Sequence, residues 1–465
     1  MGFYKKKLFI YKSVAIYLMF VNSCIYFRFN NCCQAFTNCF QAYTQDEYHM
    51  NISGQTQKME KIMNRKIITL SLVAGLSLFS LVGCGSSSDS TNTTDSESSS
   101  GIVVTGQSLS YDSDGEAITP IEGEDFYGQD AVYASNSFSL RDNGDGTTSD
   151  LNTKLMWQQE PTTETFMWAE ATEYCEALSL AGYSDWRTPS LYELISIEDF
   201  SDGWPYLDTD YFSLGDMAIS KDLQFWSSNY YLANDIGKAF GLNYGTGHIK
   251  AYSAEATGAG DMPVDGSPQE TDTDTDMTPP PPMESGTEMP MGNVAQKLVR
   301  CVRGDAYGVS QFVDNGDGTI SDLSSGLMWM QNDAGEGLDW EGALAYAENL
   351  EYAGYSDWKL PNVKELQSIV DYTGVYPAIS PSFFSVTDDD AYYWTSTSAY
   401  FSKASEEQQK YYWAWYVAFG YAVDGSGEDS HGAGAVRYDT KVEGGPQGED
   451  AERVYNHVRA VRLIK

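Results

Sequence analysis

The sequence has little positive charge. Its 465 residues include 28 Lys and Arg against 66 Asp and Glu, and the formal net charge is −38. Nucleic-acid binding needs Lys and Arg to neutralise phosphates, so this composition excludes a nucleic-acid partner. Residues 84–465 alone hold 19 basic and 63 acidic side chains. A surface this acidic stays soluble and attracts cations rather than anionic polymers.

Cysteine and histidine are also scarce, with 7 and 4 residues. His248, His431 and His457 neither cluster along the chain nor show ligand spacing, so we predict no metal site and no cofactor. A serine motif of the hydrolase kind at Gly425–Gly427 lacks the required glycine spacing and the strand–helix context. The sequence therefore predicts a protein without enzymatic activity.

The N-terminal region contains an export signal. A short basic start at Met63 is followed by an apolar stretch, Ile67 to Val82, and then by Gly83-Cys84. This order is typical of a secretory signal peptide, and the apolar run is short for a membrane-spanning helix. The end of the stretch resembles the lipobox of bacterial lipoproteins, in which the Cys is acylated; an ordinary signal peptide with a coincidental Cys is the alternative.

We therefore predict a signal peptide at residues 63–83 and a lipid anchor on Cys84, with residues 1–62 an over-extended N-terminus. The anchor places the protein in the cell envelope, in the outer membrane if the cell has one. Residues 84–125 are predicted to be a disordered, acidic tether rich in Ser and Thr. Residues 254–296, with their Thr-Asp and Pro runs, are predicted to be a disordered acidic insert.

An internal repeat organises the rest of the chain. Without a gap, a shift of 172 positions superimposes three motifs. These are Asp142–Thr147 on Asp314–Thr319, Leu155–Trp157 on Leu327–Trp329, and Ala181–Trp186 on Ala353–Trp358. Such self-similarity indicates duplication of one unit. We predict a first domain at 126–305, which contains the insert, and a second domain at 306–465.

Each copy has the same predicted elements. Asn-Gly and Asp-Gly pairs predict a hairpin at 142–150 and at 314–322. Helical periodicity begins at Trp168 and Trp340, and a second helix follows Ser190 or Asn362 with a capping-box Glu three residues later. In the closing Val-Arg-x-Val-Arg segments we expect Val inward and Arg outward. The fold class is α+β: two helices against a twisted, mainly antiparallel sheet, with long loops.

Only two cysteines remain beyond Cys84, namely Cys175 and Cys301. In the second copy both positions are alanine, Ala347 and Ala460. Two partners that are lost together are what a bond predicts, and an exported domain lies in a compartment that permits disulfides. We therefore predict a Cys175–Cys301 disulfide.

The motif set as a whole resembles the Lcl C-terminal domain family, which is named after a collagen-like bacterial adhesin. The resemblance rests on D-N-G-D-G-T, L-M-W, A-G-Y-S-D-W, the E-L-x-S-I helix and V-R-x-V-R, and it covers both copies. It implies a fold related to C-type lectin-like and formylglycine-generating-enzyme-like domains. It also implies a role in binding at the cell surface.

Two motifs invite a calcium site but favour another interpretation. In Asp142–Thr147 the third and fifth positions of the motif are glycine, where a calcium loop needs oxygen donors, so we interpret it as a tight turn with Asp and Asn capping their own backbone. Trp226–Asn229 lacks the acidic residue that follows the Trp-Asn pair of C-type lectins. Calcium-dependent sugar binding is not predicted at either motif.

The candidate ligand surface combines aromatic and basic residues. Aromatic faces stack on sugar rings, and a strand that alternates is expected to present its Arg side chains on one face. The candidates are Tyr411, Tyr412, Trp415, Arg300, Arg303, Arg459 and Arg462. We predict a surface-anchored, non-catalytic binding or adhesion protein whose partner is a glycan or a protein. A cell-envelope enzyme acting on carbohydrate or peptide, and a structural scaffold, are the alternatives.

Overall fold

The computed structural model describes residues 101–465 apart from several short gaps and one long gap at 255–295. The chain divides into two units, Met1–Thr94 and Asp95–Lys465, and all described residues belong to the second unit. The described ranges are 101–133, 137–215, 217, 219–220, 223–232, 237–254, 296–388, 390–400, 409–423, 427, 429–446 and 452–465. The predicted signal peptide, Cys84 and nearly all of the acidic insert lie outside them.

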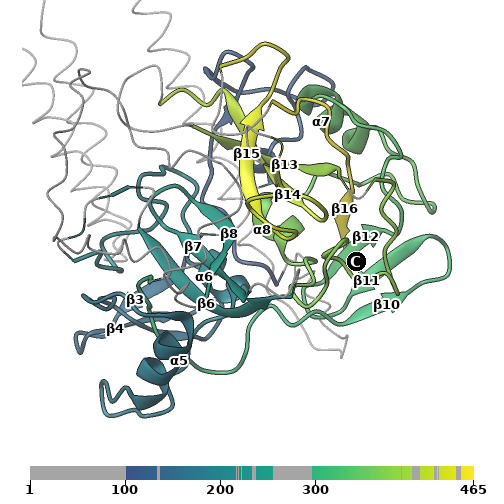
Figure 1. Ribbon diagram of the computed structural model, residues 1–465. Coiled ribbons are helices and arrows are strands. Elements are labelled where there is room, and N and C mark those ends of the chain that lie inside the picture. The colour runs from purple at the N-terminus through teal and green to yellow at the C-terminus, as the bar shows by residue number, and fades with distance from the viewer. Residues whose placement is uncertain are drawn as a thin grey trace, which may run out of the picture. The chain divides into compact units, whose positions relative to one another are not determined.

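Each copy contributes strands to two sheets and contains two principal helices, in the same order along the chain (Figure 1). The elements of the first copy are β3 Leu140–Asp142, β4 Thr147–Asp150, β5 Met156–Gln158, α5 Trp168–Ala177, α6 Leu191–Ser196, β6 Gln224–Tyr231, β7 Lys238–Asn243, β8 His248–Ser253 and β9 Val302–Arg303. Those of the second copy are β10 Phe312–Asp314, β11 Thr319–Asp322, β12 Leu327–Met330, α7 Trp340–Glu348, α8 Val363–Gln367, β13 Tyr392–Ala399, β14 Trp413–Ala418, β15 Val436–Thr440 and β16 Val461–Leu463. The predicted α+β class, hairpins and helices are confirmed.

One antiparallel sheet of four strands belongs to each copy alone. The strand orders are β3-β4-β5-β9 and β10-β11-β12-β16. In both, the D-N-G-D-G-T motif forms the tight turn of the first hairpin, with its second Gly at a φ of 86° or 90°. A left-handed φ costs glycine little because it lacks a Cβ.

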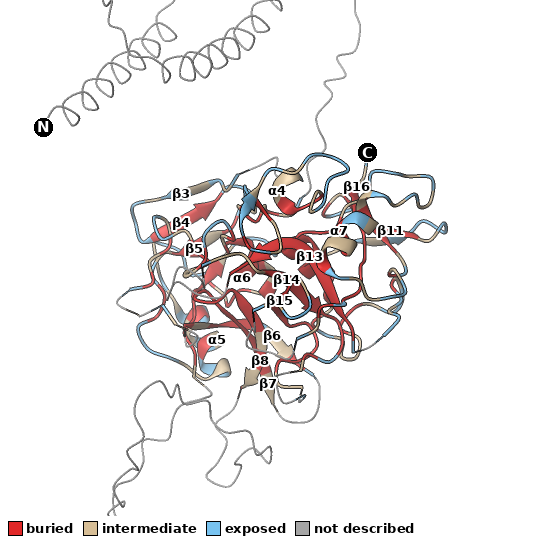
Figure 2. Cartoon of the chain, turned by 90° about the horizontal axis from the view of Figure 1, so that it is seen from above, coloured by how far each residue is buried: buried red, intermediate tan, exposed pale blue. Residues whose placement is uncertain are grey.

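The remaining strands of the two copies form a single six-stranded sheet. Its order is β13-β14-β15-β8-β7-β6, so the three strands of one copy mirror those of the other. The antiparallel contact of β15 with β8 lies at the centre, where Val436 is opposite Ile249. Burial is concentrated on this sheet and the helices beside it (Figure 2). One hydrophobic core, containing Trp157 and Trp329, continues from one copy into the other. The two copies are therefore joined by a shared sheet and a shared core, in the way that the two subunits of a symmetric dimer can be.

Residues 101–133 form an ordered arm rather than the predicted tether. The arm contains β1 Ser110–Tyr111, β2 Ala117–Ile118 and α4 Asp130–Tyr133. Val103, Gln107 and Tyr111 on it are buried. The prediction of disorder up to residue 125 was wrong, because it weighed the polar composition and not the few apolar and amide side chains that pack. Residues 84–100 lie outside the described range.

The second helix of each copy begins as predicted. Ser190 accepts a hydrogen bond from the backbone of Glu193, and Asn362 does the same for Glu365. The carboxylate of each Glu in turn accepts a hydrogen bond from the backbone N–H of its cap residue. This reciprocal pattern satisfies amides that the first turn leaves without partners.

Candidate functional site

The predicted aromatic surface does not exist as one site. Trp415 is completely buried, and its ring packs edge-on against Tyr206 at 5.4 Å and Phe200 at 5.3 Å. Tyr411 is half-buried and stacks on Tyr111 of the arm, with ring centroids 3.8 Å apart. Tyr412 is also half-buried. The prediction of Trp415 as a ligand residue was wrong because both faces of β14 are covered.

The predicted basic surface is also absent. Arg300 and Arg459 have no exposed surface, and each donates its guanidinium hydrogens to three backbone carbonyls of its own copy. Arg303 forms a bidentate ion pair with Asp185, at 2.8 and 3.0 Å, and Arg462 does so with Asp357. The four arginines do not share a face. They are structural, and the prediction that they form a ligand surface was wrong.

The D-N-G-D-G-T turns are capped by their own side chains, as we interpreted them. Asp142 accepts from the backbone of Gly144, and Asp145 accepts from the backbone and hydroxyl of Thr147. The second copy repeats these bonds. No group of three or more His, Cys, Asp or Glu side chains suited to a metal ion occurs among the described residues.

The other two sequence predictions concern structural residues. Cys175 of α5 and Cys301, the residue before β9, form a disulfide, which confirms the predicted bond. Asn229 of the Trp226–Asn229 motif accepts a hydrogen bond from the backbone of Leu191, at the start of α6. The side-chain oxygen of Asn229 therefore accepts a hydrogen bond from the first turn of a helix here.

A buried polar network in the second copy escaped the sequence analysis. The Asp333 carboxylate accepts hydrogen bonds from the Tyr393 hydroxyl at 2.6 Å and from Thr387, and His457 Nδ1 lies 3.7 Å from it. The side chain of Asp333 is 1% exposed. Through these hydrogen bonds, Asp333 ties the loop at Thr387 to Tyr393 of β13.

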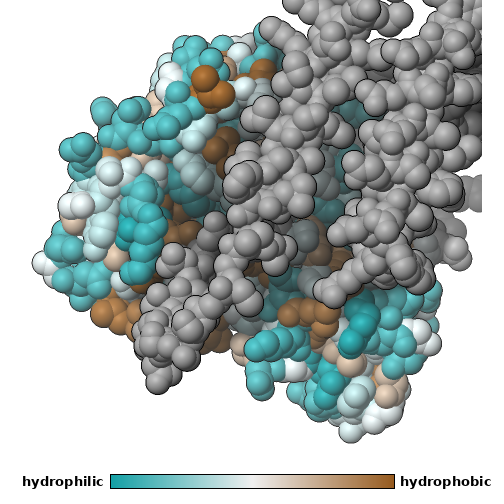
Figure 3. Space-filling model, turned by 180° about the vertical axis from the view of Figure 1, so that it is seen from behind, coloured by the Kyte–Doolittle hydropathy of each residue, from teal (hydrophilic) through white to brown (hydrophobic). Residues whose placement is uncertain are grey.

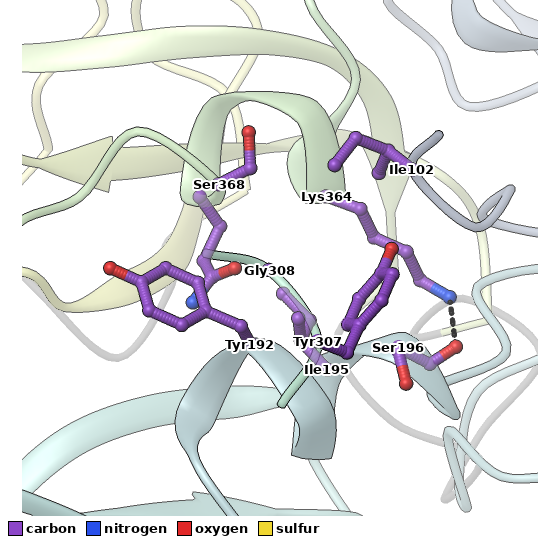
Figure 4. A pocket seen from close by; sticks show the side chains of 9 residues that line it. Ile102, Tyr192, Ile195, Ser196, Tyr307, Gly308, Lys364 and Ser368 are labelled. Atoms are coloured by element: carbon purple, nitrogen blue, oxygen red, sulfur yellow. Dashed lines mark hydrogen bonds between the residues drawn. The ribbon is translucent and has the colours of Figure 1, made fainter. Parts of the chain in front are cut away.

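A small cavity lies between the copies, where α6 of the first faces α8 of the second (Figure 4). Its volume is about 10 Å³, which is about the space that one water needs. The lining residues are Ile102, Tyr192, Ile195, Ser196, Tyr307, Gly308, Lys364, Gln367 and Ser368. A cavity of this size has no room for a substrate.

Lys364 lines this cavity, and the charge of the buried Glu198 acts on it. The Lys364 ammonium donates to the carbonyl of Ser196 at 3.0 Å and to that of Val104 at 2.8 Å. Burial lowers the pKa of Lys364 to about 7. Glu198 is completely buried, and its two carboxylate oxygens find no hydrogen-bond partner among the described residues. Burial raises the pKa of Glu198 well above its ordinary value, although Lys364 opposes the shift.

The clearest difference between the copies is a face formed by the first long helix and the adjacent edge strand. In the second copy this face consists of α7 and β13, and the arm covers it. Trp340 is completely buried, with the ring of Phe126 6.2 Å away, and every residue of β13 is buried. We call this the covered face.

The equivalent face of the first copy, formed by α5 and β6, is accessible; we call it the open face. Trp168 and Tyr230 are partly exposed, with ring centroids 5.3 Å apart, and Ser228 is exposed. The equivalents of Thr172 and Tyr230 on the covered face are Leu344 and Ser398, both buried. The open face thus carries a second ring, Tyr230, where the covered face has the small hydroxyl of Ser398, and a hydroxyl, Thr172, where the covered face has the apolar Leu344.

The visible surface elsewhere is largely hydrophilic. On the side opposite to the view of Figure 1, the described residues that are visible are mostly hydrophilic, with hydrophobic side chains in places between them (Figure 3). No helix within the described ranges has the length and apolar character that crossing a membrane requires. The open face is our candidate binding site because its two rings are partly exposed, whereas the cavity has space for only about one water.

The arrangement defines a tandem α+β module whose copies share a sheet and differ in one exposed aromatic face. The model of the Lcl C-terminal domain family matches the chain twice, at residues 146–261 and 318–438, which together make up more than half of it. The chain belongs to the Lcl C-terminal domain family, as its motifs indicated, and this membership suggests an adhesin-like role. No curated protein and no solved structure matches it, so the lectin-like fold relationship stays a prediction.

Proposed function

We propose that this chain is a lipid-anchored, non-catalytic binding protein of the bacterial cell envelope, and that the open face of the first copy holds its ligand, a glycan or a protein. The observation that carries the proposal is that two equivalent faces of the copies differ in solvent exposure. Trp168 is partly exposed, whereas Trp340 is buried by the arm. Exposed aromatic rings that neighbour polar side chains are typical of binding surfaces.

The described residues support binding more than catalysis. The buried Lys364, on which the charge of Glu198 acts, lines a cavity with space for about one water. The envelope enzyme that we considered as an alternative would need converging carboxylates in a pocket open to substrate. Family membership adds the adhesin-like context.

The anchor rests on the sequence between Met63 and Cys84. In this proposal the mature protein begins at Cys84, carries lipid there and sits in the outer membrane if the cell has one. Mass spectrometry of the membrane fraction should find acylated Cys84 at the N-terminus and no peptide from residues 1–62. Abundant peptides from residues 1–62 would overturn the proposed start.

A binding screen tests the ligand surface. The full chain is applied to arrayed glycans and matrix proteins, beside a variant with Trp168→Leu and Tyr230→Ser. We expect the captured ligand to be lost in the variant, because both changes remove rings from the open face while Leu retains apolar packing on α5. The control is Tyr455→Ser, which changes an exposed aromatic residue of the second copy that is 63% accessible. Equal capture by all three proteins would show that the open face is not the binding surface.

A further inference from the structure

The covered face shows what this type of face binds, since its occupant is a polypeptide. Residues 126–133 of the arm lie on α7 and β13 through three side chains. Phe126 packs at 6.2 Å from Trp340. Asp130 accepts a hydrogen bond from the Thr397 hydroxyl at 3.0 Å, and the Tyr133 hydroxyl donates to Glu348.

We call the surface of α7 and β13 that receives residues 126–133 the seat. A cation of the second copy and a glycine of the arm also contribute to this contact. The ammonium of Lys359 lies 5.5 Å from the centre of the Tyr133 ring, and its charge opposes the rise that burial causes in the pKa of Asp130. Gly128 has a φ of 89°, and a Cβ there would lie 2.6 Å from the Glu348 carboxylate. The segment therefore passes close to the Glu348 side chain of α7, in a backbone conformation that favours glycine at that point.

The first copy retains the residues that receive the ring, the tyrosine and the carboxylate. By the repeat, Trp340, Glu348 and Lys359 correspond to Trp168, Glu176 and Arg187. Trp168 donates to the Ser227 carbonyl, as Trp340 donates to that of Thr395, so the two indoles are held alike. Glu176 is exposed, and the Arg187 side chain is 34% exposed. Asn229 stands in place of Thr397 and still offers amide hydrogens to a carboxylate.

The seat on the first copy is shorter than that on the second. Lys441 holds the earlier part of the arm by donating to the carbonyls of Tyr111 and Asp112. The strand register that pairs β8 with β7 and β15 with β14 makes Ala254 its equivalent. The open face therefore keeps the seat for residues 126–133 and lacks the anchor for the residues before them.

From these contacts we propose that the open face binds a short polypeptide segment of a partner protein, one that carries an aromatic ring, a carboxylate and a tyrosine in the order of Phe126, Asp130 and Tyr133. This inference rests on the proposed function, in which the open face is the ligand surface. The arm of the chain itself already occupies the covered face, so the segment comes from another protein. In this proposal the second copy is filled by its own arm, and the first copy is the receptor.

The test uses a fluorescent peptide with the sequence of Ile121–Tyr133 and the full chain. We expect saturable binding that Trp168→Leu and Glu176→Lys each weaken tenfold or more. A peptide with Ala at the Phe126 position should bind at least tenfold more weakly. The matched control is Glu173→Lys, which makes the same charge change on α5. Its equivalent, Ala345, is exposed and therefore not covered by the arm, so binding should change less than twofold.

Two results would overturn the inference. One is the absence of saturable binding up to about 1 mM peptide. The other is binding that Trp168→Leu and Glu176→Lys leave unchanged, because the peptide would then be displacing the arm from the covered face. If the peptide fails to bind while Trp168→Leu with Tyr230→Ser still abolishes capture of a glycan, the open face remains the ligand surface and only the ligand class is wrong.

Discussion

Val436 lies opposite Ile249 at the centre of the six-stranded sheet, and this pair joins the strands of the two copies. Both side chains are completely buried in the hydrophobic core that runs through both copies. Neither copy can lose its part of this core without exposing apolar surface of the other. The two family domains therefore form one cooperative structure and not two independent modules.

The first prediction is that both copies unfold in one transition. A calorimetric scan should give a calorimetric enthalpy equal to the van't Hoff enthalpy for the whole described unit. Ile249→Asp places an unpaired charge in the shared core, so it should lower the midpoint of that single transition. Two separated peaks, with only the earlier one shifted by Ile249→Asp, would contradict the shared core.

Much of each copy could be predicted from local patterns. The glycine-rich turns and the Ser190 and Asn362 caps depend on residues within a few positions of one another, and the structure has them as expected. The disulfide could be predicted because the duplication supplied a comparison, with Ala347 and Ala460 in the place of the cysteines. These features need no knowledge of how distant segments pack.

The closing strands were misinterpreted for a physical reason. In Val299–Arg303 the two valines are three positions apart, and a strand with period two places Val299 and Val302 on opposite sides. Arg300 therefore lies on the same side as Val302, in the interior. Its burial is possible only because the carbonyls of Gln158, Gln159 and Ser213 come from distant segments to receive it.

The arm and the open face were missed because they depend on contacts between segments far apart in sequence. A signal was nevertheless present in the repeat. The second copy has the apolar Leu344 and the small Ser398. The first copy has the hydroxyl of Thr172 and the ring of Tyr230 at the equivalent positions. Such paired differences indicate that one face is covered and the other is not.

The second prediction concerns the buried arginines. Arg300→Lys should lower the free energy of unfolding by about 3 kcal/mol or more, because an ammonium cannot reach all three carbonyls and buried acceptors lose their partners. Arg303→Lys, at a pair whose Asp185 side chain is 62% exposed, should cost under about 1 kcal/mol. Urea unfolding measures both. Equal costs would refute a structural role for Arg300.

The third prediction concerns pH. Burial raises the pKa of Glu198 above the ordinary value of 4.5, so the folded state binds a proton that the unfolded state releases. The contribution of Glu198 to stability is therefore fully present below about pH 4.5 and is lost as the pH rises from there, by at most about 1.4 kcal/mol per pH unit. Lys364, with a pKa lowered to about 7, acts in the opposite direction only at and above that value.

Glu198→Gln removes this titration, so urea unfolding between pH 5 and pH 7 should show a flatter stability profile than that of the parent protein. Glu173→Gln, at an exposed position of α5, is the control and should leave the profile unchanged. Parallel profiles for the parent and Glu198→Gln would mean that Glu198 is not buried in solution.

The last prediction is that the protein does not bind heparin-like glycans strongly at physiological salt. Sulfated chains need a cluster of exposed Arg and Lys, and residues 84–465 hold 63 acidic side chains against 19 basic ones. The repeated arginines cannot provide that cluster, because Arg300 and Arg459 are buried against carbonyls, and Arg303 and Arg462 are each paired with an aspartate. On a heparin column we expect the full chain to elute below about 0.3 M salt, where exposed charges are already well screened. Asp185→Asn frees Arg303 on the surface of the first copy and should delay elution slightly. Retention of the parent protein beyond that salt concentration would show that a local basic patch outweighs the net charge.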